Sequence, residues 1–187
     1  MQDLSLHILD IVENSTKAGA TLVKIQIIED TDKNLLQIVI EDNGHGMDPE
    51  MVKSVRDPFV TTRTTRSVGL GLSLLEQAAK ETGGDLSIIS HTGHGTTVKA
   101  TFQANHIDRK PVGDIGSTLV SLVAGNPDID FVYNGDFHDE SIELDTREVR
   151  AELGGIVPLN DAAVLKLLRD LFKKSGKPEQ HEYGPEV

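Results

Sequence analysis

The hydrophobic positions in the first hundred residues change their period several times. Apolar side chains recur at helical spacing over residues 3–18, which predicts an amphipathic helix. Residues 21–30 and 35–42 instead alternate apolar and polar side chains, which predicts two strands joined as a β-hairpin by the polar turn TDKN. A second helix over 70–84, stopped by two glycines, and a second hairpin over 85–104 are expected next.

This order of helix, two strands, helix and two strands predicts the fold class. We expect an α+β fold, a two-layer α/β sandwich whose mixed, mainly antiparallel sheet carries its helices on one face. Residues 48–68 interrupt the pattern, because they show little periodicity and are rich in Thr, Arg and Ser. We predict a long loop there.

The character of the chain changes after Ala104, where NHIDRKPVG is typical of a linker. Beyond it we expect a short helix, two strands and two further helices, at 115–125, 129–134, 141–144, 146–153 and 161–175. Asp145 or Thr146 is expected to cap the fourth of these elements, and Asn160 the last. In the last helix Leu165, Leu168 and Phe172 form an apolar stripe that we expect to pack in a core.

These changes divide the chain into three predicted parts. Residues 1–105 form the main domain, 106–175 a small α/β C-terminal extension, and 176–187 a polar tail that we expect to be disordered. An extension of about 70 residues is marginal as an independent core. We therefore expect it to dock on the main domain or on a second copy of the chain.

Composition and charge exclude several classes of function. The chain has no cysteine, which rules out disulfides, thiolate metal sites and a cysteine nucleophile. No stretch approaches the ~20 apolar residues of a membrane span, and the N-terminus lacks a basic lead, so we expect a soluble, cytoplasmic protein without a membrane partner. The net charge of −12 offers no basic surface for nucleic acid, although one nucleotide needs only one or two cations.

Four short segments carry candidate chemistry, and each fits one part of a nucleotide: DNGHGM (42–47), DPFVTTR (57–63), SVGLGLSLL (67–75) and HGTTV (94–98). An Asp at a strand end can accept a hydrogen bond from an exocyclic amine, and glycines at a helix N-terminus expose amides that favour phosphate. A Thr/Arg-rich loop can close over phosphates, and an Asn oxygen suits Mg²⁺. Each segment alone is also common as a turn, a loop or a strand.

Together these segments resemble the GHKL superfamily: the ATP-binding domains of gyrase, heat-shock chaperones, histidine kinases and MutL, which share the Bergerat sandwich. The resemblance covers residues 3–104. Two segments resemble motifs of the MutL proteins: ENSTKAGA, which is similar to their N box, and GTTV. Two others, DPFVTTR and VGLGLSL, look like the F box and second glycine box of bacterial histidine kinases. The resemblance implies ATP and Mg²⁺ as ligands.

The resemblance also implies a role for each matching position. Asn14 would coordinate Mg²⁺, and Asp42 would bind the adenine amino group in a pocket shaped by Gly44, Gly46 and Met47 and supported by Thr96. Backbone amides of Gly69, Leu70, Gly71 and Leu72 would wrap the triphosphate. The lid would include Phe59, Thr61, Thr62 and Arg63.

Asp10 lies one helical turn before Asn14. Gyrase-like and MutL-like members carry there a glutamate that activates water, and many histidine kinases carry an asparagine. A general base must come within about 2.6–3.2 Å of its proton or act through one water. The shorter Asp10 is thus a candidate base that either needs a relay or does no chemistry, and Glu13 is a weaker candidate.

Two departures from the kinase pattern bear on function. Ser67 stands where the second glycine box usually has a glycine, which would stiffen the lid hinge. In this sequence no helical segment with a phosphoacceptor histidine precedes the Asn14 helix, and His7 lies within that helix. We therefore expect no autophosphorylation on a built-in histidine.

Three functions remain open. The chain is expected to be a stand-alone kinase subunit that phosphorylates a partner protein, which the kinase-type lid favours. Asp10 and the MutL-like segment favour an ATPase switch that opens and closes a homodimer. A third possibility is a non-catalytic sensor of ATP or ADP that docks a protein partner through residues 106–175.

Overall fold

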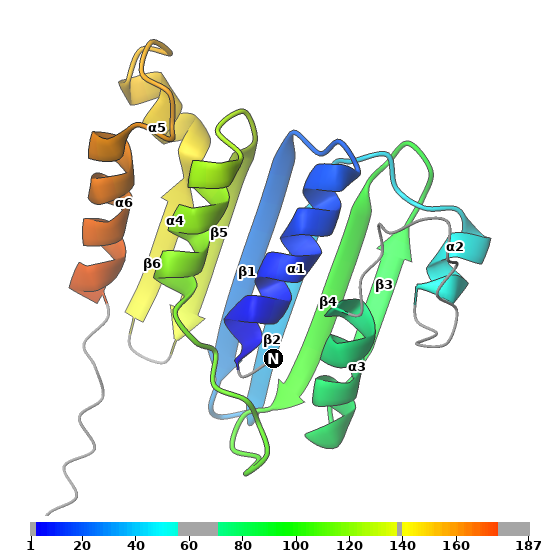
Figure 1. The fold of residues 1–187 in the computed structure, drawn as a ribbon. Helices are drawn as coiled ribbons and strands as arrows, with labels where there is room; N and C mark the ends of the chain where they lie inside the picture. The colour runs from blue at the N-terminus through cyan, green and yellow to red at the C-terminus, as the bar shows by residue number, and fades with distance from the viewer. Residues whose placement is uncertain (1–2, 56–70, 138–139, 176–187) are drawn as a thin grey trace, which may run out of the picture.

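The computed structural model describes residues 3–55, 71–137 and 140–175, and within them six strands form one sheet in the order β3-β4-β2-β1-β5-β6 (Figure 1). The strands are β1 (Leu22–Asp30), β2 (Leu35–Asp42), β3 (Leu86–Ser90), β4 (Thr96–Gln103), β5 (Asp130–Phe137) and β6 (Glu140–Asp145). The helices are α1 (Leu4–Lys17), α2 (Pro49–Ser54), α3 (Gly71–Glu81), α4 (Ile115–Gly125), α5 (Thr146–Glu152) and α6 (Ala162–Ser175). The predicted α+β class is confirmed.

Both predicted hairpins are present, and they lie side by side. β1 pairs antiparallel with β2, β2 with β4, and β3 with β4. Helices α1, α3, α4 and α6 cover one face of the sheet (Figure 1). Val23, Ile25 and Ile27 of β1 are buried, whereas Lys24 and Gln26 between them are exposed, as the alternating pattern predicts.

The C-terminal extension continues the same sheet. β5 pairs parallel with β1, from Leu22 opposite Asp130 to Glu29 opposite Phe137, and β6 pairs antiparallel with β5. One cluster of buried apolar side chains runs through both parts of the chain. The extension thus docks on the main domain by adding strands, while the division of the chain into domains at residue 105 stays a prediction.

Two details differ from the expectations. α2 lies within the segment predicted as a loop, because Asp48 accepts a hydrogen bond from the Met51 amide and Pro49 occupies the first turn. At α6 the Ala163 amide donates to the Asp161 carboxylate at 2.8 Å, so Asp161 takes the capping role predicted for Asn160.

The other C-terminal helix features agree with the sequence. Asp145 caps α5, as one of the two alternatives predicted. The apolar stripe of α6 packs inward: Leu168 is buried, and the Phe172 ring meets the Tyr133 ring edge-on with centroids 5.9 Å apart. Within the described ranges, no helix is both long and apolar enough to span a membrane.

Candidate functional site

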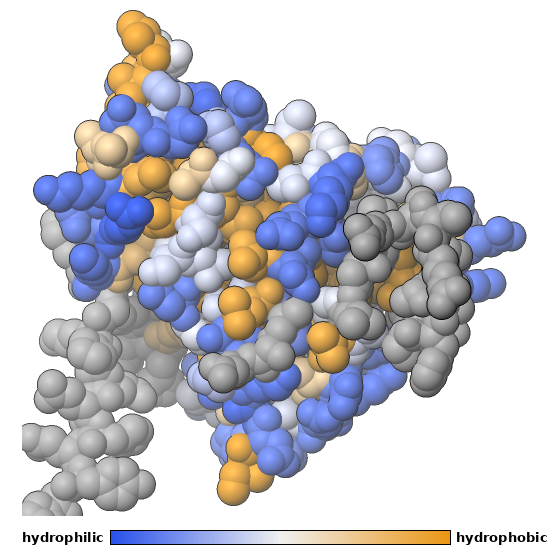
Figure 2. Space-filling model, viewed as in Figure 1, coloured by the Kyte–Doolittle hydropathy of each residue, from blue (hydrophilic) through white to orange (hydrophobic). Residues whose placement is uncertain are grey.

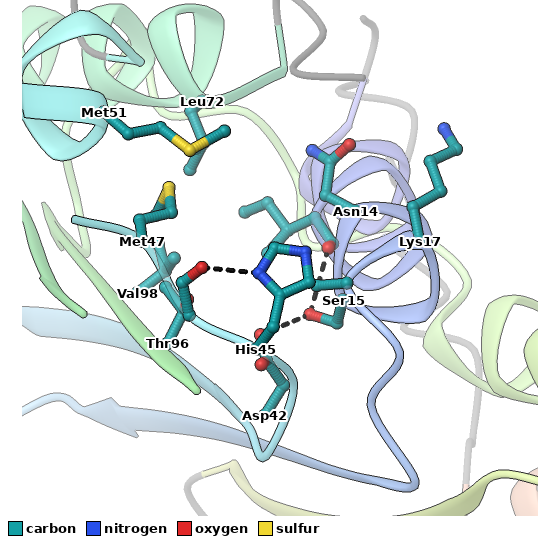
Figure 3. A pocket seen from close by; sticks show the side chains of 13 residues that line it. Asn14, Ser15, Lys17, Asp42, His45, Met47, Met51, Leu72, Thr96 and Val98 are labelled. Atoms are coloured by element: carbon teal, nitrogen blue, oxygen red, sulfur yellow. Dashed lines mark hydrogen bonds between the residues drawn. The ribbon is translucent and has the colours of Figure 1, made fainter. Parts of the chain in front are cut away.

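A pocket opens between α1, the segment that follows β2, the start of β4 and the first turn of α3. Its cavity measures about 100 Å³. Six residues predicted to bind a nucleotide line it: Asn14, Asp42, Gly46, Met47, Leu72 and Thr96. In the view of Figure 3, Asp42 lies at the bottom and Asn14 at the upper right on α1, with Ser15 between them.

Asp42 is the last residue of β2, and two donors fix its carboxylate. The Ser15 hydroxyl donates to Oδ2 at 2.8 Å, and the Gly44 amide donates to Oδ1 at 2.9 Å. These two hydrogen bonds hold the carboxylate in one orientation. The lone pairs that remain can accept a further hydrogen bond from a ligand in the pocket.

Ser15 was not predicted as a site residue. It follows Asn14 directly and lies on the buried side of α1, where it is 3 % exposed. Its contact with Asp42 spans 27 positions in the sequence. In the sequence, only its place directly after Asn14, the predicted Mg²⁺ ligand, hints at a role.

The segment after Asp42 is tied to the turn between α1 and β1. The Asn43 side-chain oxygen accepts from the amides of Thr21 and Leu22, both at 2.9 Å. The His45 amide donates to the Ala18 carbonyl at 2.9 Å. These bonds hold the α1 helix and the Asp42 strand end in one fixed arrangement.

Gly46 is required by the backbone at this point. Its φ is +67°, which side chains with a Cβ rarely adopt, and a Cβ there would lie 2.1 Å from the His91 carbonyl oxygen. The chain can therefore pass close to the turn between β3 and β4 only with glycine. The predicted role of Gly46 in shaping the pocket agrees with this packing.

Thr96 reaches the pocket because β4 pairs with β2 so that it lies opposite Asp42. Its hydroxyl lies 2.9 Å from that of Ser90, which also accepts from the Met47 amide at 2.8 Å. Ser90 was not predicted either. It joins the β3–β4 turn to the pocket wall and thereby supports Thr96 and Met47.

Asp10 lies beside the start of α3 rather than among the residues that line the cavity. A Cβ at Gly71 would come within 2.8 Å of the Asp10 carboxylate oxygen Oδ2, so the carboxylate packs directly against the first residue of that helix. The positive end of a helix dipole favours a negative charge there. Its role as a general base stays a prediction.

His7, one turn before Asp10, is fully buried. Neither ring nitrogen has a hydrogen-bond partner in the described part of the chain. Burial lowers the pKa of His7, and the nearby Lys110 charge lowers it further. The ring is thus kept neutral and shielded from any phosphoryl donor on a partner molecule.

Several predicted residues lie outside the described residues: Phe59, Thr61, Thr62, Arg63, Gly69 and Leu70. Within residues 3–55, 71–137 and 140–175, no three His, Asp or Glu side chains gather as a metal site. The coordination of Mg²⁺ by the Asn14 oxygen together with phosphate oxygens stays a prediction.

Comparison with known proteins gives one family. The model of the histidine kinase-, DNA gyrase B- and HSP90-like ATPases matches residues 2–106. The chain is 35% identical over 103 residues to a putative sensor protein of Shewanella frigidimarina, a match that covers 54% of this chain and 16% of that protein. It is 33% identical over 113 residues to the tetrathionate sensor histidine kinase TtrS of Salmonella typhimurium, covering 58% and 18%.

Other matches extend the range of similar proteins. The probable C4-dicarboxylate sensor kinase of Bacillus subtilis is 37% identical over 75 residues, which cover 40% of this chain and 14% of that protein. Among solved structures, the Aquifex aeolicus MutL ATPase domain complexed with ADP aligns with a TM-score of 0.49 and 16% identity over 94% of this chain and 70% of that one. The chain spans less than a fifth of the length of these curated relatives.

Proposed function

The chain belongs to the family of histidine kinase-, DNA gyrase B- and HSP90-like ATPases, and from this premise we propose that it binds Mg²⁺–ATP and transfers the γ-phosphoryl group to a partner protein. The single observation that carries the proposal is the Asp42 carboxylate at the floor of the pocket, fixed by Ser15 and Gly44. An acceptor held in this way suits the exocyclic amine of adenine.

The pocket has the chemistry that a purine base needs. Its walls include the apolar side chains of Met47, Met51, Leu72 and Val98, which can pack on both sides of a flat ring. A cavity of about 100 Å³ is smaller than the roughly 300 Å³ at the lower end for whole ligands, so it fits the base alone. The phosphates would then extend along α1 toward Asn14 and the first turn of α3.

Asn14 and Gly71 mark that phosphate side. The Asn14 side-chain oxygen would bind Mg²⁺ together with phosphate oxygens, and the cation would neutralise charge during phosphoryl transfer. Gly71 begins α3, where free amides and the helix dipole attract anions. Asp10 lies against Gly71, so its negative charge would face the phosphate side of the site, and a cation held by Asn14 would offset the repulsion.

Two observations favour the kinase role over other uses of ATP. Two of the relatives are described as sensor kinases. The sequence of the lid segment resembles the kinase F box. His7 is buried, which favours an acceptor side chain on a partner protein. The cytoplasmic location expected from the sequence is part of this proposal. The acidic charge of −12 makes nucleic acid a poor partner.

The second candidate function is a slow ATPase switch in a homodimer. The position of Asp10 favours it, because a carboxylate one turn from Asn14 and beside α3 lies on the side where γ-phosphate would be attacked by water. A non-catalytic ATP or ADP sensor would use the same pocket without that base.

Radiolabelled ATP separates these functions. The kinase predicts almost no phosphate release by the purified chain and label transfer when a cell extract of the source supplies the partner. The switch predicts steady phosphate release without any partner. Sustained release by the pure chain would contradict the kinase proposal and support the switch.

The role of Asp10 can be tested in the same assay. In whichever reaction the assay detects, label transfer or phosphate release, we expect Asp10→Asn to lower turnover at least about tenfold, because the amide cannot accept a proton. Nucleotide affinity should stay nearly unchanged. Glu13→Gln tests the weaker candidate on the exposed side of α1, and this variant should keep its turnover if Asp10 is the base. Equal turnover in Asp10→Asn would remove Asp10 as the base.

A further inference from the structure

A second cavity lies at the opposite end of the helix layer from the first turn of α3. It measures about 730 Å³, within the range of roughly 300–1,000 Å³ that is common for small-molecule sites. The first turn of α4, the last turns of α6, the inner face of β5 and the linker before α4 enclose it. Figure 2, which is drawn in the same view as Figure 1, shows hydrophobic side chains between α4 and α6. Hydrophilic side chains lie on the outer side of α6.

The hydroxyl of a largely buried tyrosine lines this cavity. Tyr133 of β5 is 2 % exposed, and no residue in the described ranges forms a hydrogen bond with its hydroxyl. The hydroxyl oxygen is not among the fully enclosed side-chain atoms that lack a partner, so it faces the open cavity, where a water or a ligand atom can complete its hydrogen bond. Burial raises the pKa of Tyr133, which keeps the hydroxyl protonated and able to donate.

Gly135 makes room for this hydroxyl. A Cβ at Gly135 would lie 2.2 Å from the Tyr133 oxygen and 3.0 Å from the Phe137 ring. Alternate residues of a strand share one face, so Tyr133, Gly135 and Phe137 form a continuous floor. Ile142 of β6 and Phe172 of α6 add apolar walls beside it.

The charges around the cavity favour an anion. Arg169 and Lys173 stand one turn apart on α6 and line the cavity, and neither has a partner among the residues that the structure describes. The two acidic residues that line the cavity already have partners. Glu29 pairs with Arg109 at 3.2 Å, and both Asp114 oxygens accept from Ser117, at 2.8 and 2.7 Å.

We propose that this second cavity binds a small organic carboxylate with an apolar or aromatic body. The carboxylate pairs with Arg169 and Lys173, the body packs among Phe137, Ile142 and Phe172, and the Tyr133 hydroxyl donates to an acceptor atom of the ligand. The residues of this site lie almost entirely beyond the matched range 2–106, so the proposal stands apart from the proposed ATP site.

The experiment uses 3-phenylpropionate as the probe and measures its dissociation constant by ligand-observed NMR. The uncharged amide of the same acid is the matched ligand, and we expect it to bind at least about tenfold more weakly because it cannot form the ion pair. The Arg169→Gln/Lys173→Gln double variant should weaken the acid about tenfold. Tyr133→Phe, which keeps the ring, should weaken it about threefold to tenfold.

Two controls show where the probe binds. Lys166→Gln changes another exposed cation of α6 that does not line the cavity, and it should leave the affinity unchanged. Asp42→Asn should also leave it unchanged, which separates this site from the ATP pocket. No binding to the wild-type chain, equal binding of acid and amide, or a loss confined to Asp42→Asn would each overturn the proposal.

Discussion

The two cavities along this sheet present polar groups of opposite character. At the first, a carboxylate held by Ser15 and Gly44 presents acceptor oxygens to the pocket. At the second, Tyr133, Arg169 and Lys173 present donors and positive charge. The first suits a base with an exocyclic amine, and the second suits an anion. One sheet thus carries two cavities whose polar groups come from different elements.

The largest expected effect falls on the first cavity alone. Asp42→Asn should abolish ATP binding, with an affinity loss of at least about 100-fold. The side-chain NH₂ group of the asparagine would replace one acceptor oxygen, so that this donor would face the adenine amino group, which is also a donor. Calorimetry with Mg²⁺–ATP measures it, with the exposed Asp128→Asn as the control. Retained micromolar affinity in Asp42→Asn would refute the assignment of adenine to Asp42.

Gly46→Ala should have the next largest effect, on both stability and ATP affinity. Gly46 and Gly155 have nearly the same φ, +67° and +69°, but only Gly46 has a backbone atom in the way of a Cβ. We expect Gly155→Ala to lower the free energy of unfolding by about 1 kcal/mol through strain alone, and Gly46→Ala by about 3 kcal/mol. Urea unfolding measures both, and equal losses would show that the packing against His91 is unimportant.

Ser15→Ala tests how far the second donor to Asp42 matters. Loss of this hydroxyl leaves one carboxylate oxygen without its partner, so we expect ATP affinity to fall about tenfold. Thr16→Ala removes the neighbouring hydroxyl, which bonds within α1 to the Glu13 carbonyl, and serves as the control. If both variants bind ATP equally well, Ser15 does not orient Asp42.

The smallest effect concerns the wall of the second cavity. Asp114 caps α4, and its bonds from the Ser117 amide and hydroxyl hold its pKa below the usual range. The folded-state pKa is thus lower than the unfolded one, so this stabilisation is complete above about pH 4 and is lost as the pH falls through the folded-state value. Asp114→Ala should cost about 1 kcal/mol at pH 7 and less at pH 2–3 in urea unfolding. A cost that does not change with pH would contradict the capping role.

The sequence was most informative where a pattern is local. Alternation in β1 and β2 and the helical spacing of α1 and α3 predicted those elements, because their buried faces repeat every few residues. The motif resemblance brought Asn14, Asp42 and Thr96 together, and the structure places them around one pocket. The six residues of α2 escaped prediction because so short a helix depends on the Asp48 cap and Pro49 rather than on a repeat.

Non-local contacts could not be predicted in this way. The bond from Ser15 to Asp42 and the parallel pairing of β5 with β1 join positions far apart in the sequence. The second cavity combines Arg109, Tyr133 and Arg169 from three separate elements, and none of them lies in a recognised motif. Local spacing carries no signal for such a site, because only the folded sheet brings its parts together.

The most direct test of the ATP site is a crystal structure of the chain with Mg²⁺ and a non-hydrolysable ATP analogue. The account predicts the adenine amino group within hydrogen-bond distance of the Asp42 carboxylate and the metal ion bound by the Asn14 side-chain oxygen. An analogue bound elsewhere, or a metal ion that Asn14 does not touch, would contradict it.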